Sequence, residues 1–244
     1  MAISVAVIGA GVVGGTLIKW FYKNTDHKVS IYDPDKGYKA NLLGCEYVFI
    51  CVPVPTRSDY TQDTSILEDS INICSEKSMI FCRSTVLPGT CDKLGITALP
   101  EFLTARFAYE EMSRLDIIVG LKNYQEFMLD IFPEKRIHFM TNREAEIVKY
   151  THNVYGAMKI NYFNIINELC ELHKADYKKV IQAMAMTGFH DLMYTEVPGP
   201  DGSYGFGGTC FPKDLEAFYG LTGKEFFSAI LKDNSFYRKK INKN

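Results

Sequence analysis

The sequence lacks the cysteine pattern of a disulfide framework or of a zinc site. Its seven cysteines are an odd number, and no two of them are spaced as Cys-x-x-Cys. Several lie inside apolar runs such as YVFICVPV and MIFCRS, where a thiol packs as a small hydrophobic group. This usage argues against a disulfide-rich secreted scaffold and predicts a reduced, cytoplasmic protein that binds no metal.

An excess of charge of one sign and long apolar runs are missing as well. The formal net charge is -2, so no broad basic field exists to hold nucleic acid. The basic residues at the end of the chain are interpreted as a solvated helix face; they are Arg238, Lys239, Lys240 and Lys243. No apolar run reaches the ~18 residues that span a membrane, and the N-terminus has no basic signal-peptide segment. We therefore expect neither a nucleic-acid partner nor a membrane partner.

What the sequence does contain is a series of short β-branched runs separated by helical segments. Of its 244 residues, 47% are hydrophobic, which is enough for one sizeable core or a core and a satellite domain. The runs predict strands at 3–8, 29–32, 47–52, 78–82, 96–99 and 116–119. The segments between them predict helices at 16–23, 65–74 and 124–131. This alternation predicts an α/β sheet.

The pattern changes after residue 141. Asn142 is a candidate helix N-cap, with Glu144 and Glu146 in the first turn. Only Gly156 interrupts the helical pattern up to residue 173, which predicts a helix about 45 Å long. Such a helix bridges domains or packs against another subunit. A second helix at 177–186, a Gly/Pro-rich loop at 198–208 and a short helical tail follow. We predict an α/β domain at 1–141, and the long helix with a small helical domain at 142–244.

Three glycines in the first domain form a dinucleotide-binding motif. Gly9, Gly11 and Gly14 follow a predicted strand and open a helix. In this motif the first glycine permits the turn, the second lets the backbone approach a pyrophosphate, and the third lets helix and strand pack closely. Asp33, at the end of the next strand, can bind the ribose hydroxyls and would repel a 2′-phosphate. The motif predicts NAD rather than NADP; a glycine turn without a ligand is the alternative.

A second glycine-rich segment precedes a cysteine. Three of the four residues at 205–208 are glycines, which allows close approach to a ligand and offers amides to a phosphate. Cys210 follows directly, and Lys213 and Asp214 come within one helical turn. A nearby cation favours a thiolate and a carboxylate can move a proton, so the segment is a candidate nucleophile site. A buried small cysteine is the alternative.

A third candidate pair lies on the long helix. Lys149 and Asn153 are four residues apart, so they share one helix face and can converge on one oxygen atom. An ammonium aimed at an alkoxide is the electrostatic stabilisation that acyl chemistry needs. The alternative is a solvated face on which Glu146 pairs with Lys149.

These blocks stand in a fixed order with others along nearly the whole chain: VIGAGVVG at 7–14, FICVPVPT at 49–56, STVLPGT at 84–90, PEFL at 100–103, Asn-Glu at 167–168 and VPGPDGSYGFGGTCFPKD at 197–214. Together they resemble the UDP-glucose 6-dehydrogenase family, which includes GDP-mannose and UDP-N-acetylmannosamine dehydrogenases. The resemblance implies a Rossmann-type NAD-binding domain, a long connecting helix and a small helical domain.

The resemblance implies a four-electron oxidation that consumes two NAD per nucleotide sugar, with UDP-glucose, oxidised to UDP-glucuronate, as the leading substrate. The sugar alcohol becomes an aldehyde, then a thiohemiacetal, a thioester and finally a carboxylate. Cys210 matches the nucleophile, Lys149 the lysine that stabilises the oxyanion, and Asn153 its helical neighbour. The residues that match those holding and activating water are Thr85, Glu101 and Asp214.

The resemblance also implies binding residues and a partner. The residues expected to contact NAD are Gly9, Gly11, Val12, Val13, Gly14, Asp33, Val52, Pro53 and Thr85. The residues expected to contact the nucleotide sugar are Phe102, Leu103, Lys149, Asn153, Tyr204, Gly205, Phe206 and Gly207. The long helix is apolar on more than one face, which indicates burial on several sides and, with the family, predicts a homodimer through this helix.

Four features depart from the family. The resemblance ends near Asn234, so we expect a short form without the family's C-terminal domain that closes over the substrate. Only 13 residues lie between Asp33 and Tyr47, too few for the helices usual there. Ala105 stands where a second glutamate normally follows PEFL, unless Glu110 or Glu111 supplies that carboxylate. The arginine that many members place before the glycine-rich loop is absent; the residues there are Phe189, His190 and Asp191, and His190 is a candidate substitute.

Two other functions remain open at this point. The first is a β-hydroxyacid-type NAD dehydrogenase, which also uses a lysine on the long helix but performs one oxidation. Cys210 distinguishes the two, because a single alcohol oxidation needs no thiol. The second is a protein that binds NAD or a nucleotide sugar without turnover, or that dimerises with a full-length partner.

Overall fold

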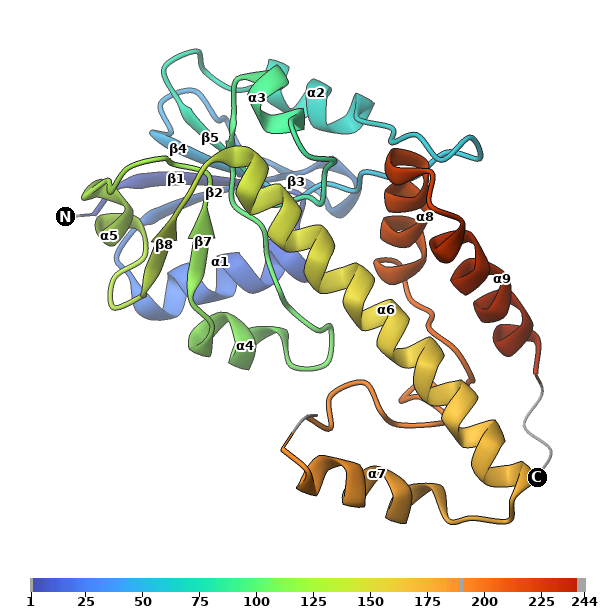
Figure 1. The fold of residues 1–244 in the computed structure, drawn as a ribbon. Helices are drawn as coiled ribbons and strands as arrows, with labels where there is room; N and C mark the ends of the chain where they lie inside the picture. The colour runs from blue at the N-terminus through green and yellow to red at the C-terminus, as the bar shows by residue number, and fades with distance from the viewer. Residues whose placement is uncertain (1, 189–190, 241–244) are drawn as a thin grey trace. The chain divides into compact units, whose positions relative to one another are not determined.

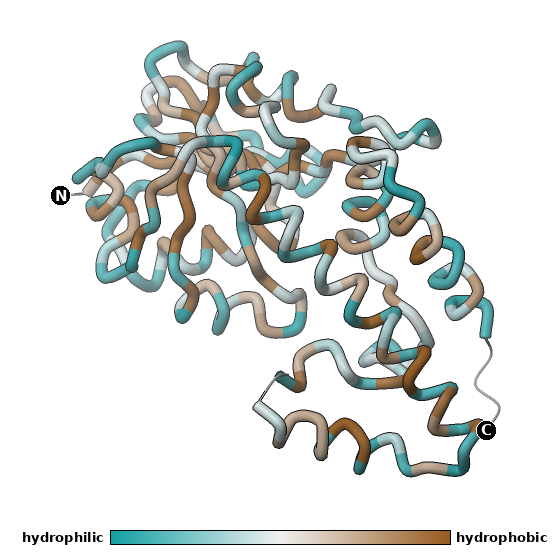
Figure 2. The backbone as a smooth tube through the Cα atoms, viewed as in Figure 1, coloured by the Kyte–Doolittle hydropathy of each residue, from teal (hydrophilic) through white to brown (hydrophobic). Residues whose placement is uncertain are grey.

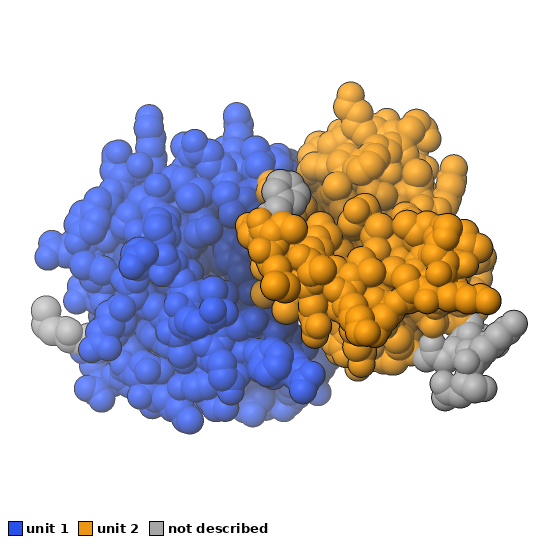
Figure 3. Space-filling view, turned by 60° about the horizontal axis from the view of Figure 1, so that its bottom comes forward, with its two compact units in different colours: residues 1–57, 62–150 blue, residues 58–61, 151–244 orange. Residues whose placement is uncertain are grey.

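The computed structural model describes residues 2–188 and 191–240. The chain forms two compact units: residues 1–57 with 62–150 make unit 1, and residues 58–61 with 151–244 make unit 2 (Figure 3). The division falls inside the longest helix rather than before it, and the short segment 58–61 belongs to the second unit.

Unit 1 is built on a six-stranded sheet with the order β3-β2-β1-β4-β5-β6. Five strands are parallel: β1 (Ser4–Ile8), β2 (Lys28–Asp33), β4 (Tyr47–Ile50), β5 (Met79–Cys82) and β6 (Thr97–Ala98). The remaining strand, β3 (Tyr38–Lys39), is antiparallel to β2. The predicted α/β fold is confirmed, and each predicted strand lies within two residues of the observed one.

Helices cover both faces of this sheet (Figure 1). One face is covered by α1 (Val12–Asn24), α4 (Ala108–Arg114) and α5 (Phe127–Ile131), and the other by α2 (Ser65–Asn72) and α3 (Thr90–Leu94). The sequence predicted α1, α2 and α5, although α5 begins three residues later than expected. It did not predict α3 and α4, which are short and gain their stability from packing on the sheet.

The strand sequences explain why the sheet is buried on both sides. Side chains alternate between faces along a strand, and Val5 and Val7 of β1 pack into the core with α1, whereas Ala6 and Ile8 pack into the core with α2. Hydrophobic residues accordingly run without a polar break through the central strands (Figure 2). The carboxyl ends of these parallel strands meet at one edge, where the first glycine-rich turn lies.

The connection between β2 and β4 is short, as the sequence predicted. It holds a 3-10 turn, η1 (Pro34–Lys36), and the strand β3, with no α-helix between them. After β6 the chain adds a small parallel pair, β7 (Ile117–Val119) and β8 (Ile137–Phe139). The Gly120 N–H donates to the Ala98 carbonyl over 2.7 Å, which joins this pair to the end of β6.

The long helix α6 (Asn142–Leu172) contains 31 residues and is continuous, as predicted. Its N-cap is Thr141 rather than Asn142. The Thr141 hydroxyl accepts from the Glu144 N–H, and the Glu144 carboxylate accepts from the Thr141 N–H and hydroxyl, which forms a capping box. Asn142 instead turns its side chain to the end of the sheet, where it accepts from the Ala98 N–H over 2.8 Å.

Unit 2 is helical. It contains the C-terminal part of α6, followed by α7 (Tyr177–Met186), α8 (Phe211–Thr222) and α9 (Glu225–Lys239). The predicted bounds of α7 agree with the structure, and Asp176 caps it by accepting from two backbone amides. The single helical tail that we expected is two helices, because Gly223 adopts a left-handed conformation (φ 61°) that ends α8. Within residues 2–188 and 191–240, none of the helices has the length and apolar character required to cross a membrane.

Candidate active-site residues in the two units

The first glycine-rich turn lies between β1 and α1 in unit 1. Gly9 has φ 86°, and a Cβ there would lie 2.7 Å from the Cys51 carbonyl oxygen. A Cβ on Gly14 would lie 1.8 Å from the Gly9 carbonyl oxygen, so helix and strand can pack this closely only with glycine. Gly11 is different, because no atom lies within 4 Å of the position of its Cβ. Two glycines therefore serve packing, and the third leaves open space at the N-terminus of α1.

Asp33 fixes this turn from the end of β2. Its Oδ2 accepts from the Ala10 N–H over 2.7 Å. Asp33 also lines a pocket of about 360 Å³ together with Gly9, Val52 and Pro53, at the carboxyl ends of the strands. Four of the residues predicted to contact NAD thus surround one cavity. Val12 is more than half exposed beside the turn, whereas Val13 is partly buried.

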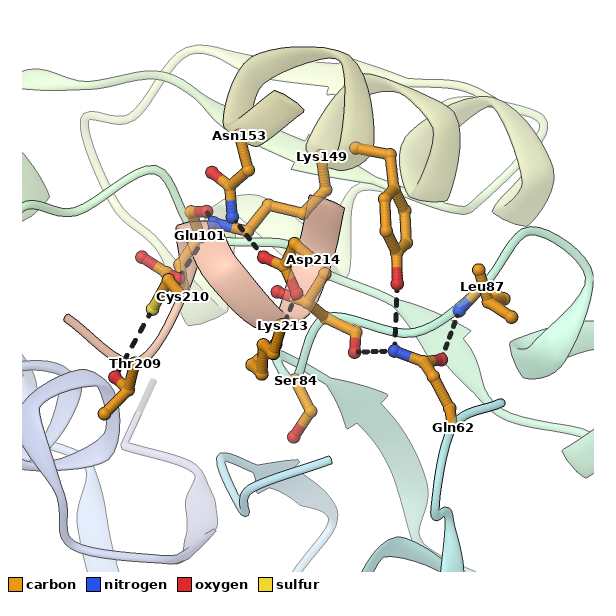
Figure 4. Close-up of polar contacts among 12 residues, drawn as sticks. Gln62, Ser84, Leu87, Glu101, Lys149, Asn153, Thr209, Cys210, Lys213 and Asp214 are labelled. Carbon is orange, nitrogen blue, oxygen red and sulfur yellow. Dashed lines mark hydrogen bonds and ion pairs between the residues drawn. The ribbon is translucent and has the colours of Figure 1, made fainter. Parts of the chain in front are cut away.

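Lys149 of α6 makes an ion pair with Glu101, which follows β6. The Lys149 ammonium lies 3.0 Å from Glu101 Oε1 and donates to the Glu101 carbonyl oxygen over 2.6 Å (Figure 4). Both side chains are buried. Phe102 places its ring centroid 5.4 Å from the same ammonium, and the Leu103 N–H donates to Glu101 Oε2 over 2.7 Å. Two residues of the PEFL motif, Glu101 and Phe102, therefore contact the Lys149 ammonium directly.

This arrangement determines the charge state of Glu101. Burial raises the pKa of the carboxyl group, but the Lys149 ammonium and the Leu103 N–H both stabilise the carboxylate and outweigh burial. The positive charge of Arg83 acts in the same direction. The pKa of Glu101 consequently lies below its usual value, and the group is a carboxylate at neutral pH.

Glu146 does not pair with Lys149, so that alternative is wrong. Its carboxylate oxygens accept from the Gly89 N–H over 2.5 Å and from the Cys91 N–H over 2.8 Å, at the start of α3. The solvated helix face is also wrong, because Lys149 and Asn153 are both more than nine-tenths buried.

Gln62 organises the segment that contains Thr85, and no motif in the sequence singled it out. Its amide nitrogen, Nε2, donates to the Thr85 carbonyl over 3.2 Å and to the Tyr150 hydroxyl over 2.9 Å (Figure 4). Its Oε1 accepts from the Leu87 N–H over 2.8 Å. One glutamine therefore holds the STVLPGT segment at two points and ties it to α6. Only the fold brings residues 62, 85 and 150 together.

In unit 2, Cys210 stands at the start of α8. It is the N-cap residue of that helix, followed by Phe211 and Pro212 in the first turn. Among the seven cysteines its side chain is exposed, whereas the others are buried or partly buried. Burial raises the pKa of Cys51 to about 12, so that thiol is protonated at neutral pH. The structure excludes the interpretation of Cys210 as a buried small residue.

Asp214 lies one turn further along α8 and is completely buried. Its Oδ2 accepts from Asn153 Nδ2 over 2.6 Å, and its Oδ1 is in contact with the Lys213 ammonium (Figure 4). The Asp214 N–H donates to the Cys210 carbonyl over 3.0 Å. Four residues that the sequence singled out therefore form one cluster at the start of α8, and Asn153 contributes to it from α6.

The glycine-rich loop before Cys210 lines a second pocket of about 360 Å³ in unit 2. Its wall includes Gly205, Phe206, Gly207, Tyr194 and Phe211. Phe206 is itself almost fully buried.

Other predicted positions have different surroundings. Tyr204 does not line this pocket; its ring lies 4.6 Å from the Lys240 ammonium. Of the two carboxylates considered as replacements at position 105, Glu110 is exposed, and Glu111 is buried and accepts from the Thr104 N–H and hydroxyl. Phe189 and His190 lie outside the described residues. Asp191 forms an ion pair with Lys159 over 2.8 Å.

Comparison with known proteins agrees with this arrangement. Residues 143–233 match the central domain of the UDP-glucose/GDP-mannose dehydrogenase family. UDP-glucose 6-dehydrogenase of Rickettsia typhi is 28% identical over 207 residues, which cover 75% of this chain and 46% of that protein. The chain thus spans about half the length of the curated relatives it matches.

Solved structures give the same result for the fold. A UDP-glucose dehydrogenase from Pyrobaculum islandicum superimposes with a TM-score of 0.82 at 22% identity, over 97% of this chain and 68% of that one. A 3-hydroxyisobutyrate dehydrogenase from Mycobacterium tuberculosis superimposes with a TM-score of 0.73 at 14% identity, over 97% of this chain and 94% of that one. At these identities the likeness establishes a shared Rossmann-type fold.

Proposed function

We propose that this chain is an NAD-dependent enzyme of the UDP-glucose/GDP-mannose dehydrogenase family that oxidises a nucleotide sugar, since residues 143–233 match the central domain of that family. UDP-glucose, converted to UDP-glucuronate, is the leading substrate. The observation that carries this proposal is the start of α8, where the Cys210 thiol is exposed while Asp214, one turn later, is buried and held by Asn153 and Lys213. An exposed thiol beside a fixed carboxylate suits a nucleophile rather than a packing residue.

NAD is assigned to the carboxyl edge of the unit 1 sheet. The open space at Gly11 and the positive end of α1 suit a pyrophosphate, and Asp33 in the neighbouring pocket suits the ribose hydroxyls. Val52 and Pro53 line the same pocket. NAD bound there would take up two electrons in each of the two oxidations, so two molecules are consumed per sugar.

Cys210 is proposed to carry the covalent step. After the first oxidation, its thiolate adds to the aldehyde carbon, and the carbonyl oxygen takes up a proton to give a thiohemiacetal. In the second oxidation this carbon gives up its hydrogen as a hydride, the hydroxyl group gives up its proton, and a thioester is left. Water then adds to the thioester carbon, the carbon–sulfur bond breaks, and the products are the carboxylate and the free thiol.

Lys149 is proposed to stabilise the negative charge of the reaction, and the carboxylates are proposed to bind the attacking water and accept its proton. Lys149 is fixed by Glu101 and can exchange one of these contacts for the oxyanion that develops on the sugar carbon. Glu101 is a carboxylate at neutral pH and can accept a proton from the attacking water. Thr85 and Asp214 are proposed to hold that water, and Asn153 to orient Asp214.

The nucleotide sugar is assigned to the glycine-rich loop of unit 2, where Gly205 and Gly207 expose main chain to a pocket. By the family resemblance, Phe102 and Leu103 of unit 1 are also proposed to contact the nucleotide sugar. We also propose a homodimer through α6. Large apolar side chains are exposed along this helix, at Ile147, Tyr155, Tyr162, Ile165 and Leu169, and Tyr155, Tyr162 and Ile165 line a groove of about 490 Å³. Such an exposed apolar surface is typical of a subunit interface.

A β-hydroxyacid dehydrogenase is the second candidate. The match to 3-hydroxyisobutyrate dehydrogenase covers 94% of that chain, so the single-oxidation enzymes share the entire fold of this protein. Cys210 favours the first candidate, because transfer of one electron pair from an alcohol requires no covalent intermediate.

The test follows the reduction of NAD. Purified protein is mixed with NAD and UDP-glucose, and the reduced cofactor formed per sugar is measured for the wild type and for Cys210→Ala. Two reduced cofactors per sugar, with turnover lost in the variant, are expected. Cys74→Ala is the matched control, because the pKa of the half-buried Cys74 thiol is raised to about 11 by burial and this thiol lies in unit 1.

Other outcomes contradict specific parts of the proposal. One reduced cofactor per sugar, unaffected by Cys210→Ala, would identify the single-oxidation enzyme. Absence of turnover with UDP-glucose and with a panel of UDP- and GDP-sugars would favour a protein that binds without turnover, or one that needs a partner chain.

A further inference from the structure

Two asparagine side chains hold the main chain of the glycine-rich loop in unit 2. Asn234 of α9 accepts from the Phe206 N–H over 2.7 Å through Oδ1 and donates to the Phe206 carbonyl over 3.0 Å through Nδ2. Asn164 of α6 accepts from the Gly205 N–H over 3.1 Å through Oδ1. Both asparagines are more than nine-tenths buried. The loop is therefore held by side chains from two helices.

The chemistry of this contact requires a neutral amide at position 234. A side-chain amide presents one acceptor and one donor group, which matches the N–H and C=O of a single residue as a neighbouring β-strand would. A buried peptide group that loses such a partner is left with an unsatisfied polar atom, which is unfavourable. A carboxylate has no donor, so it would leave the Phe206 carbonyl facing a negative oxygen.

The glycines of the loop lie close against side chains of α9. Gly205 has φ 71°, and a Cβ there would lie 2.5 Å from Asn234 Oδ1. Arg238, one turn further along α9, pairs with Asp201 over 2.7 Å. A Cβ on Gly207 would lie 2.9 Å from the Cζ atom of its guanidinium group. One face of α9 thus covers the loop from residue 205 to residue 207.

We propose that Asn234 is a positioning residue for Cys210, and that its amide sets the course of the loop that delivers the thiol to the start of α8. Only three residues separate Phe206 from Cys210, so a displacement of the Phe206 peptide passes directly to the N-cap position. Asn164 assists from α6 by holding the preceding amide. This inference rests on the proposed function, because the nucleophile it positions is the one assigned there.

The decisive variant is Asn234→Asp, which keeps the size and the acceptor but removes the donor to Phe206. At pH 8, kcat is expected to fall at least tenfold while the KM for NAD stays within twofold of wild type, since the residues assigned to NAD lie in unit 1. As the pH is lowered toward 6, the ratio of wild-type to variant kcat is expected to shrink, because a protonated carboxyl group again has one donor and one acceptor. Asn24→Asp is the control: it removes an amide donor to the Trp20 carbonyl in unit 1, away from the loop.

A second measurement reads the loop without using activity. Hydrogen exchange of the peptide covering residues 203–210 is expected to accelerate at least tenfold in Asn234→Asp at pH 8 and to remain unchanged in Asn24→Asp. If Asn234→Asp does not fold, Asn164→Ala removes a single acceptor from the Gly205 N–H and is expected to lower kcat about threefold with faster exchange of the same peptide.

The inference is overturned if Asn234→Asp keeps kcat within twofold of wild type, if its loss of kcat does not change with pH, or if the 203–210 peptide exchanges at the wild-type rate. Failure of the proposed function is a different result: the wild-type protein itself would then show no turnover, while the exchange experiment would still report whether Asn234 holds the loop.

Discussion

The two glycine-rich loops of this protein precede helices in the same way but are held by different means. In unit 1 the turn at Gly9 is fixed by the sheet: its N–H donates to the Tyr32 carbonyl over 2.9 Å, and the neighbouring strand end at Cys51 leaves no space for a side chain. Among the described residues of unit 2 no strand lies beside the loop at Gly205, and the side-chain amides of Asn164 and Asn234 supply the partners.

This difference explains why the contacts that hold the first loop can be predicted from its local sequence and those that hold the second cannot. A parallel sheet offers main-chain partners of any sequence, so the loop itself carries the whole signal, three glycines at fixed spacing. A helical unit has no free main-chain groups along its helices, so buried loop amides must be satisfied by specific side chains. Those side chains lie 41 and 28 residues away from the residues they bind.

The largest change in the free energy of unfolding is expected for a substitution that disrupts the glycine-rich turn of unit 1. In Gly14→Ala the added Cβ would overlap the Gly9 carbonyl oxygen, which is main chain and cannot move aside. We expect a loss of about 3 kcal/mol in the free energy of unfolding, measured by urea denaturation. A loss below 1 kcal/mol would mean that the helix and strand are packed less closely than the structure indicates.

Gly205→Ala makes the corresponding change in unit 2. The new Cβ meets the side chain of Asn234 rather than main chain, and a side chain can shift, but the φ of 71° disfavours any residue other than glycine. We expect about 1–3 kcal/mol of destabilisation, smaller than for Gly14→Ala in the same assay, together with reduced turnover. Equal effects in the two units would remove the distinction between a loop fixed by main chain and one fixed by side chains.

Gly11→Ala separates binding from stability within the first turn. Because nothing lies within 4 Å of the Cβ position, the free energy of unfolding should change by less than about 0.5 kcal/mol. Affinity for NAD should fall about tenfold, or 1.4 kcal/mol, since the methyl group occupies the space assigned to the pyrophosphate. Calorimetric titration measures this, with Gly15→Ala as a control at the next glycine of α1. Unchanged affinity would contradict the cofactor assignment.

The smallest effect concerns acid stability. The pKa of Glu101 is lower in the folded protein than the ordinary glutamate value of 4.5. Just below pH 4.5 this carboxylate is therefore protonated in the unfolded chain and still ionised in the folded protein. The stabilisation from this carboxylate is present above that range and is lost as the pH falls through the folded pKa. The stability difference between wild type and Glu101→Gln should therefore narrow on acidification, which denaturation at pH 7 and pH 3 can test. A constant difference would show that the ion pair with Lys149 does not set the charge of Glu101.

The sequence alone determined the α/β class, the long helix, the motifs around Gly9 and Cys210, and every strand except β3 and β8, because each depends on short-range patterns: β-branched runs, glycine spacing and helical periodicity. It placed the cap of α6 one residue late, because Thr141 and Asn142 are both good capping residues and only the position of the sheet assigns Asn142 another contact. It joined α8 and α9 into one tail, since a single Gly223 does not reveal its left-handed conformation.

Only the tertiary structure decided which partners the site residues have. The pairing of Lys149 with Glu101 rather than Glu146, the support of Thr85 by Gln62, and the hold of Asn234 on Phe206 all join residues that are distant in sequence. Ion pairs and amide contacts act over a few ångströms, so their partners are chosen by which chain segments the packed core brings together. The local sequence specified the chemical groups, and the fold specified which of them meet.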